Sequence, residues 1–344
     1  MDPALERYSR QMRFYGMGEE GQRKLMASRV TLCGCGALGT VLANILVRAG
    51  VGHVRIVDRD FVESSNLQRQ VLFDEADVTG HMPKAEAAAK KLAAINSTIR
   101  IEPIVTDIDR TNIVELCQDA DLILDGTDNF EIRYLINDVA VKLNKPWVYG
   151  GCIGSHGQVM VILPGQTPCL RCVFEAAPAP GEAGTCETAG VLGPIVNIVA
   201  SLQATEGMKI LTGNFAQINR ELTYVDIWDN IHRSIKISPL LGKVDCPCCK
   251  HHRYEWLDGE HGSQTTSLCG RNAVQVSHRS SGRLNFEEMA RHLSVMGKVT
   301  FNRFLLKFDV DDYEFTVFPD GRAIIKGTND IDRARTLYSK YIGN

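Results

Sequence analysis

The sequence predicts an α/β protein with a Rossmann-like, doubly wound sheet, parallel at first and then antiparallel, followed by a small α+β C-terminal domain. Short apolar segments alternate with helical segments over the first 150 or so residues, a pattern typical of a parallel sheet with helices on both faces. A glycine-rich turn joins the first such strand to its helix. Beyond residue 158 the alternation gives way to strands around one long apolar helix.

Hydrophobic periodicity places the elements of the first domain. Strands are predicted at 30–33, 54–58, 99–105, 122–124 and 147–149, and helices at 39–49, 84–96, 112–117 and 130–143. The helix over 39–49, for example, carries Val41, Leu42, Ile45 and Leu46 on one face. A strand at 158–163, a buried helix at 193–211 and two strands within 221–238 complete the domain, and 174–190 reads as a loop.

A second unit follows a polar stretch over 250–267. It is predicted to contain a strand at 272–277, a helix at 284–296, a strand at 304–310, a hairpin over 313–326 and a helix at 331–342. The expected domains are therefore residues 1–257 and residues 258–344, and the sequence assigns no role to the second.

Composition limits the classes of function. The 344 residues include 38 Lys+Arg against 41 Asp+Glu, a net charge of −3, which argues against broad binding to nucleic acids or anionic membranes. No apolar run reaches the roughly 18 residues of a membrane span, and the N-terminus lacks the features of a signal peptide. A cytoplasmic location is therefore expected. In that reducing setting the 11 cysteines are predicted to be metal ligands or nucleophiles rather than disulfides.

The glycine-rich turn predicts a nucleotide site. Gly34, Gly36 and Gly39, with Ala37 among them, follow a strand and open a helix, and Asp58 ends the next strand. Glycines let a backbone approach a phosphate at a helix N-terminus, and the acidic residue can accept hydrogen bonds from ribose hydroxyls.

The residues after this turn are better matched to a triphosphate than to a nicotinamide. Asn66 and Arg69 lie in a long polar loop after Asp58, Lys84 begins a helix, and Asp128 follows a strand end. Several cations and one carboxylate are what ATP with magnesium requires. An NAD-dependent oxidoreductase has the glycine turn but leaves Asn66, Arg69 and Asp128 unexplained. A non-catalytic nucleotide-binding scaffold stays as a second alternative, disfavoured because Arg10, Lys84 and Asp128 are present together.

The motifs R-Y-x-R-Q, G-x-G-x-L-G, D-x-D-x-V-x-x-S-N-L-x-R-Q, P-K and D-x-T-D-N occur in this order. Together they resemble the ThiF/MoeB/HesA family, prokaryotic relatives of ubiquitin-activating enzymes, over residues 5–253. The resemblance implies a homodimeric enzyme that uses ATP to adenylate the C-terminal glycine of a ubiquitin-fold sulfur carrier protein, for thiamine, molybdopterin or related sulfur transfer. A cysteine desulfurase or another sulfur donor would be a further partner.

The resemblance also implies a role for each matching residue. Asp58 would hold the ATP ribose, and Asn66, Arg69 and Lys84 would contact phosphates. Asp128 would bind magnesium, and Arg10 would reach the phosphates bound by the neighbouring subunit.

Two C-x-x-C pairs predict a structural zinc site. Cys169 and Cys172 form one pair, and Cys246 and Cys249 form the other. Four thiolates from two turns match tetrahedral zinc coordination, and the resembling family has such a site. Cys248 could replace Cys249, but the spacing favours Cys249.

Two further cysteines are candidate thiol acceptors. Cys186 lies in the predicted loop and corresponds to a family cysteine that can receive the activated acyl group or sulfur. Cys269, beside Arg271 at the entrance to the second unit, is a weaker candidate, because a nearby cation can lower a thiol pKa.

Overall fold

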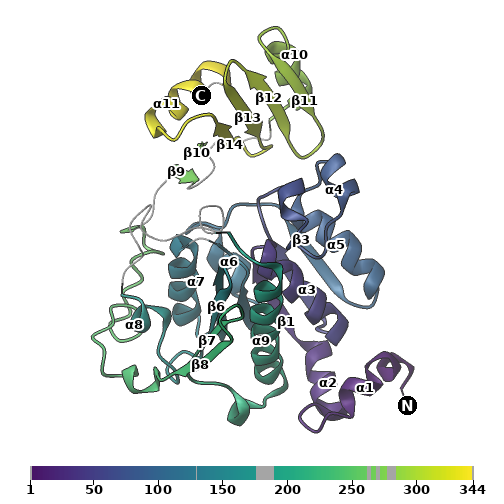
Figure 1. Cartoon of the computed structure of the whole chain (residues 1–344), viewed down its shortest axis with the longest axis vertical. Coiled ribbons are helices and arrows are strands. Elements are labelled where there is room, and N and C mark those ends of the chain that lie inside the picture. The colour runs from purple at the N-terminus through teal and green to yellow at the C-terminus, as the bar shows by residue number, and fades with distance from the viewer. Residues whose placement is uncertain are drawn as a thin grey trace. The chain divides into compact units, whose positions relative to one another are not determined.

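The computed structural model describes residues 2–128, 130–175, 190–261, 265–268, 272–276 and 284–342. These residues form two compact units, and the first extends to His261. Figure 1 shows the first unit as a sheet between helices, and the second as a smaller sheet with helices beside it. Within the described residues, no helix is both long enough and apolar enough to span a bilayer.

The first unit is built on an eight-stranded sheet with the order β3-β2-β1-β4-β5-β6-β7-β8. The strands are β1 (Arg29–Cys33), β2 (His53–Val57), β3 (Arg100–Ile104), β4 (Leu122–Asp125), β5 (Trp147–Ile153), β6 (His156–Ile162), β7 (Leu222–Asp226) and β8 (Ile231–Ile235). Pairing is parallel from β3 to β5 and antiparallel from β5 to β8. The predicted fold class is confirmed.

Helices cover both faces of this sheet (Figure 1). One side carries α3 (Ala37–Ala49), α5 (Lys84–Ile95) and α9 (Gly193–Thr212), and the other carries α6 (Ile113–Cys117), α7 (Phe130–Lys142) and α8 (Leu170–Val173). The remaining helices of this unit are α1 (Ser9–Met12), α2 (Gly18–Ala27) and α4 (Glu75–Thr79), with 3-10 turns at Pro3–Tyr8, Ser64–Asn66, Phe215–Gln217 and Ser238–Leu240.

Strand residues alternate between the two helical layers. In β4, Leu122 and Leu124 pack in the core shared with α3 and α9, whereas Ile123 between them packs in the core shared with α7. Trp147 and Val148 of β5 divide in the same way. Because a strand turns successive side chains to opposite faces, a strand covered by helices on both sides is apolar throughout.

The structure adds elements that periodicity did not predict. The N-terminal helices α1 and α2 were not expected, nor were β9 (Thr265–Leu268) and β11 (Lys298–Phe301). Much of the polar stretch 250–267 belongs to the first unit, which extends to His261. There the buried carboxylate of Asp138 accepts hydrogen bonds from the backbone of Trp256 and Leu257.

The second unit has its own core and a six-stranded antiparallel sheet, ordered β11-β12-β13-β14-β10-β9. Its remaining elements are β10 (Ala273–Val276), α10 (Phe286–Leu293), β12 (Leu306–Val310), β13 (Tyr313–Val317), β14 (Ala323–Lys326) and α11 (Ile331–Tyr341). The aromatic rings of Phe308, Phe315 and Tyr341 meet in its centre. The small α+β domain expected from the sequence is present.

Candidate functional site

The glycine turn lies where the strand order reverses, between β1 and β4. At Gly34 the backbone has φ +91, and a Cβ there would lie 2.7 Å from the Gly126 carbonyl oxygen. A Cβ on Gly39 would lie 2.1 Å from the oxygen of Gly34. The turn therefore requires glycine for close backbone packing. It leads through Gly36, the N-cap, into α3 at Ala37, so the free amides of α3 face the switch point at which open α/β sheets bind ligands.

Asp58 follows the end of β2, and its side chain contacts this turn. Its Oδ2 accepts a hydrogen bond of 2.5 Å from the Cys35 amide, and its Oδ1 accepts one of 2.7 Å from the Asp60 amide. Burial raises the pKa of this carboxyl to about 6, although the charge of Lys84 opposes the rise. The lone pairs not used by the two amides are available to ribose hydroxyls.

A cluster of charged side chains lies at the carboxyl ends of the neighbouring strands. The buried Lys84 ammonium is 3.0 Å from Asp60 Oδ2. The Arg59 guanidinium is 3.0 Å from Asp107 Oδ1. Burial works to lower the pKa of Arg59, but the carboxylates around it, Asp128 among them, outweigh burial and raise it. Lys84 and the exposed Asp128 thus belong to one charged region, which suits a magnesium triphosphate.

Asn66 and Arg69 lie in the loop after β2, which turns through Ser64–Asn66. Asn66 is buried, and its Oδ1 accepts a hydrogen bond from the Glu63 amide at 3.4 Å. The partly exposed Arg69 donates from Nη1 to the Ser65 carbonyl oxygen at 2.9 Å. The contacts of both residues with phosphate stay predictions.

Arg10 lies at the other end of the unit. Its neighbour Gln11 donates a 2.9 Å hydrogen bond to the carbonyl of Ala49, the last residue of α3, whereas the glycine turn precedes the first residue of α3. The 13 residues of α3 span about 20 Å, which is beyond the reach of an arginine side chain. The exposed Arg10 therefore does not reach the glycine turn of its own chain.

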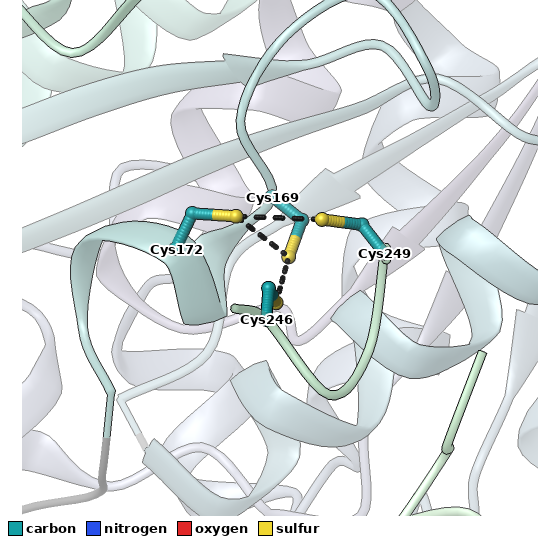
Figure 2. Close-up of side chains that lie close together, drawn as sticks. All are labelled: Cys169, Cys172, Cys246 and Cys249. Carbon is teal, nitrogen blue, oxygen red and sulfur yellow. Dashed lines mark hydrogen bonds between the residues drawn. The ribbon is translucent and has the colours of Figure 1, made fainter. Parts of the chain in front are cut away.

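Four of the predicted metal ligands come together in one cluster (Figure 2). The Sγ atoms of Cys169, Cys172, Cys246 and Cys249 all lie within 4.8 Å of one another. Nearest neighbours are 3.4–3.8 Å apart, close to the roughly 3.8 Å that tetrahedral Zn–S bonds of about 2.3 Å require. The buried thiol cluster fits zinc, as predicted from the spacing.

The surrounding side chains connect the two cysteine pairs. Asn137 on α7 accepts a hydrogen bond from the Leu170 amide at 2.8 Å and donates to Cys248 Sγ at 3.3 Å. Arg171, inside the first pair, is 2.6 Å from Glu255, beyond the second. Cys248 thus has a role in packing outside the four-sulfur cluster. Such outer contacts fix the orientation of ligand loops.

The remaining candidates, Cys186 and Cys269, lie outside the described residues. The described chain resumes at Gly190, after Cys186, and Val191 there forms a bridge to Gly154, which follows β5. The described chain therefore resumes at the carboxyl end of β5.

Sequence reasoning missed three residues of this site. Asp60 pairs with Lys84, Gly126 packs against the glycine turn, and the buried Gln70 lies beside Gly36. Each stands within two residues of a predicted site residue or inside a quoted motif, so position in the motif was the available signal. Their contacts depend on β1, β2 and β4 lying side by side.

The glycine turn at a switch point, the charged region beside it and the four-cysteine cluster define a nucleotide-binding α/β protein with a zinc-type structural site. The ThiF family model matches residues 8–248. The chain belongs to the ThiF family.

Three relatives are similar over most of this chain. The sulfur carrier protein ThiS adenylyltransferase of Bacillus subtilis (strain 168) is 44% identical over 338 residues, covering 98% of this chain and 99% of the relative. The SAMP-activating enzyme E1 of Haloferax volcanii is 39% identical, covering 71% and 88%. The sulfur carrier protein adenylyltransferase of Thermus thermophilus is 40% identical, covering 71% and 90%.

Among solved structures, E. coli MccB with ATP is 25% identical, with a TM-score of 0.61 over 71% of this chain and 74% of that chain. MccB with N-formylated MccA is 26% identical, with the same TM-score and coverage.

Proposed function

We propose that this chain is an ATP-dependent adenylyltransferase that activates the C-terminal glycine of a ubiquitin-fold sulfur carrier protein. The observation that carries the proposal is the joint presence, at one switch point, of the glycine turn, Asp58 and the Lys84 region, in a chain 44% identical over 98% of its length to a ThiS adenylyltransferase. Neither the oxidoreductase nor the non-catalytic scaffold has a counterpart among the relatives described above.

The chemistry requires no general base. A terminal carboxylate has a pKa of about 3.5 and is already ionised at neutral pH. It attacks the α-phosphorus of ATP, the bond to the bridging oxygen breaks, and pyrophosphate leaves. The task of the protein is to position both reactants and stabilise charge. Asp58 would hold the ribose, and Arg69 and Lys84 would neutralise phosphate charge. Asp128 would hold the magnesium ion, which shields the triphosphate.

Carrier-dependent exchange of pyrophosphate into ATP tests this function. Asp128→Ala and Arg69→Ala are each expected to abolish the exchange, since losing one such contact raises a barrier by on the order of 3 kcal/mol. Glu115→Ala, an exposed carboxylate on α6, serves as the matched control and should exchange normally. Exchange at the wild-type rate in either test variant would contradict the assignment.

We also propose a homodimer in which Arg10 completes the site of the partner subunit. The distance between α1 and the glycine turn of the same chain supports this arrangement, because Arg10 can act on phosphate only at another site. A cytoplasmic location, where ATP and reduced thiols are available, forms part of the same proposal.

Cys186 is proposed to accept the activated acyl group or sulfur, with Cys269 as a weaker second thiol and a cysteine desulfurase or similar protein as the sulfur source. The return of the chain at Gly190 to the sheet edge, four positions after Cys186, supports the first. Trapping a carrier thioester or acyl disulfide on Cys186 tests it. Full sulfur transfer by Cys186→Ala would exclude it, and a Cys269 that resists alkylation in the native protein would exclude the second thiol.

A further inference from the structure

Gln70 is a buried amide in the loop after β2 whose oxygen has no protein donor. Its side chain is 3% exposed, and its Oε1 accepts no hydrogen bond from any residue that the structure describes. A buried amide oxygen without a donor is unfavourable, and native proteins pair nearly all such atoms with protein, water or a ligand. Gln70 therefore has an unmet requirement for a hydrogen-bond donor.

The Gln70 amide lies over the start of α3. A Cβ built on Gly36 would be 4.0 Å from Gln70 Nε2 and 3.9 Å from the Gly126 carbonyl oxygen. Gly36 is the N-cap of α3, so the amide adjoins the helix N-terminus, where phosphate is favoured. Asp58, just after β2, accepts a hydrogen bond from the Cys35 amide of the same turn. Asp58 and Gln70 therefore both border the turn that would hold the nucleotide.

The same loop also adjoins the start of α9. A Cβ on Gly193, the first residue of α9, would be 3.2 Å from the Gln68 carbonyl oxygen. The loop therefore runs between the N-termini of α3 and α9.

The two reactants differ in the donors that they offer. The triphosphate of ATP has only hydrogen-bond acceptors, and the ribose hydroxyls are already assigned to Asp58. The adenine amino group, the other donor of ATP, lies at the opposite end of the nucleotide from the phosphates favoured at the N-terminus of α3. A carrier terminus offers a peptide N–H one carbon away from its carboxylate. A primary amide matches this pair of groups, since its oxygen accepts and its nitrogen donates.

We propose that Gln70 binds the last peptide unit of the carrier protein: Oε1 accepts the N–H of the terminal glycine, and Nε2 donates to a carboxylate oxygen. The proposal rests on the function proposed above and names the residue that recognises its acyl substrate. The contact fixes the carboxylate beside the α-phosphate, which raises the effective concentration of the nucleophile.

Exchange kinetics with a semisynthetic carrier test this contact. The probe is a ThiS-type carrier protein ending in Gly-Gly, and a second version in which an ester oxygen replaces the last peptide N–H. Gln70→Ala is expected to raise the carrier KM about tenfold or more while leaving the KM for ATP unchanged. Gln70→Met, which fills the same volume, should do the same. With the wild-type enzyme, the ester carrier should have a KM that is higher by a similar factor. Gln70→Ala should raise the KM of the ester carrier no further.

The controls separate this proposal from the function on which it rests. Gln68→Ala, an exposed glutamine of the same loop, should match the wild type. A wild-type enzyme without carrier-dependent exchange would refute the function and the proposal together. With exchange intact, a raised KM for ATP and an unchanged carrier KM in both Gln70 variants would assign Gln70 to the nucleotide. If the ester raised the carrier KM by the same factor in the wild type and in Gln70→Ala, the N–H of the natural carrier would bind an acceptor other than Gln70. Either result overturns the proposal.

Discussion

Adjacent cysteines give the sharpest test of the zinc site. Cys249 Sγ lies 3.4 Å from Cys172 Sγ within the four-sulfur cluster, whereas Cys248 Sγ receives a hydrogen bond from Asn137 and lies outside it. Structural zinc contributes about 10–16 kcal/mol shared over four thiolates, so one ligand corresponds to roughly 3 kcal/mol. Cys249→Ser is therefore expected to weaken zinc binding about a hundredfold.

The assay is competition with a chromophoric chelator, followed by elemental analysis and thermal unfolding. Cys249→Ser should release its zinc at a chelator concentration that leaves the wild type loaded, and should unfold at lower temperature because bound metal stabilises only the folded state. Cys248→Ser should retain one zinc per chain. Its loss is limited to the contacts of a buried sulfur outside the four-sulfur cluster, among them the hydrogen bond from Asn137, on the order of 1 kcal/mol each. Zinc retained by Cys249→Ser and lost from Cys248→Ser would refute the ligand assignment.

Three further outcomes follow from the nucleotide site. Because burial raises the pKa of Asp58 to about 6 and ribose hydroxyls donate to its ionised form, KM for ATP should rise up to tenfold per pH unit below about pH 6. Asp58→Asn should lose that slope, and an unchanged slope would contradict this role. Gly126→Ala places a Cβ 2.5 Å from the Gly34 carbonyl oxygen, whereas Gly36→Ala meets nothing closer than 3.9 Å. Thermal melts should show a loss of about 1–3 kcal/mol or more for the first and little for the second, and equal losses would refute the packing argument. Mixed Arg10→Ala and Asp128→Ala chains should recover about a quarter of wild-type exchange, since half the dimers regain one site. Recovery of none would contradict a shared site.

Local sequence predicted the parts of the site that depend on short-range geometry. The spacing of Gly34, Gly36 and Gly39 determines a turn within six residues, and each cysteine pair spans four. Such features arise within one turn or knuckle, so the sequence shows them directly. That both cysteine pairs lie in one cluster was predicted because zinc prefers four thiolate ligands.

Contacts that depend on the packing of distant segments were not predictable in this way. The pairing of Lys84 with Asp60 requires α5 to begin beside the loop after β2, 24 residues away in sequence. That Gln70 Oε1 lacks a hydrogen-bond donor can be recognised only from the three-dimensional positions of the residues around it. Likewise β11 is an edge strand in which Val299 is half-buried and the other three residues are exposed, and its four residues are too few to establish a period.

The zinc cluster and the nucleotide site meet through α7. Asp128 precedes the helix by two residues, and Arg133 on its first turns is 3.1 Å from the buried carboxylate of Asp125 and donates to the Thr127 carbonyl oxygen. Asn137, about 10 Å along the axis from the first residue of α7, is hydrogen-bonded to both cysteine pairs. A zinc ion held by the four thiolates would have no open position for substrate. It would support the reaction structurally, by fixing the helix that presents the Asp125–Asp128 loop.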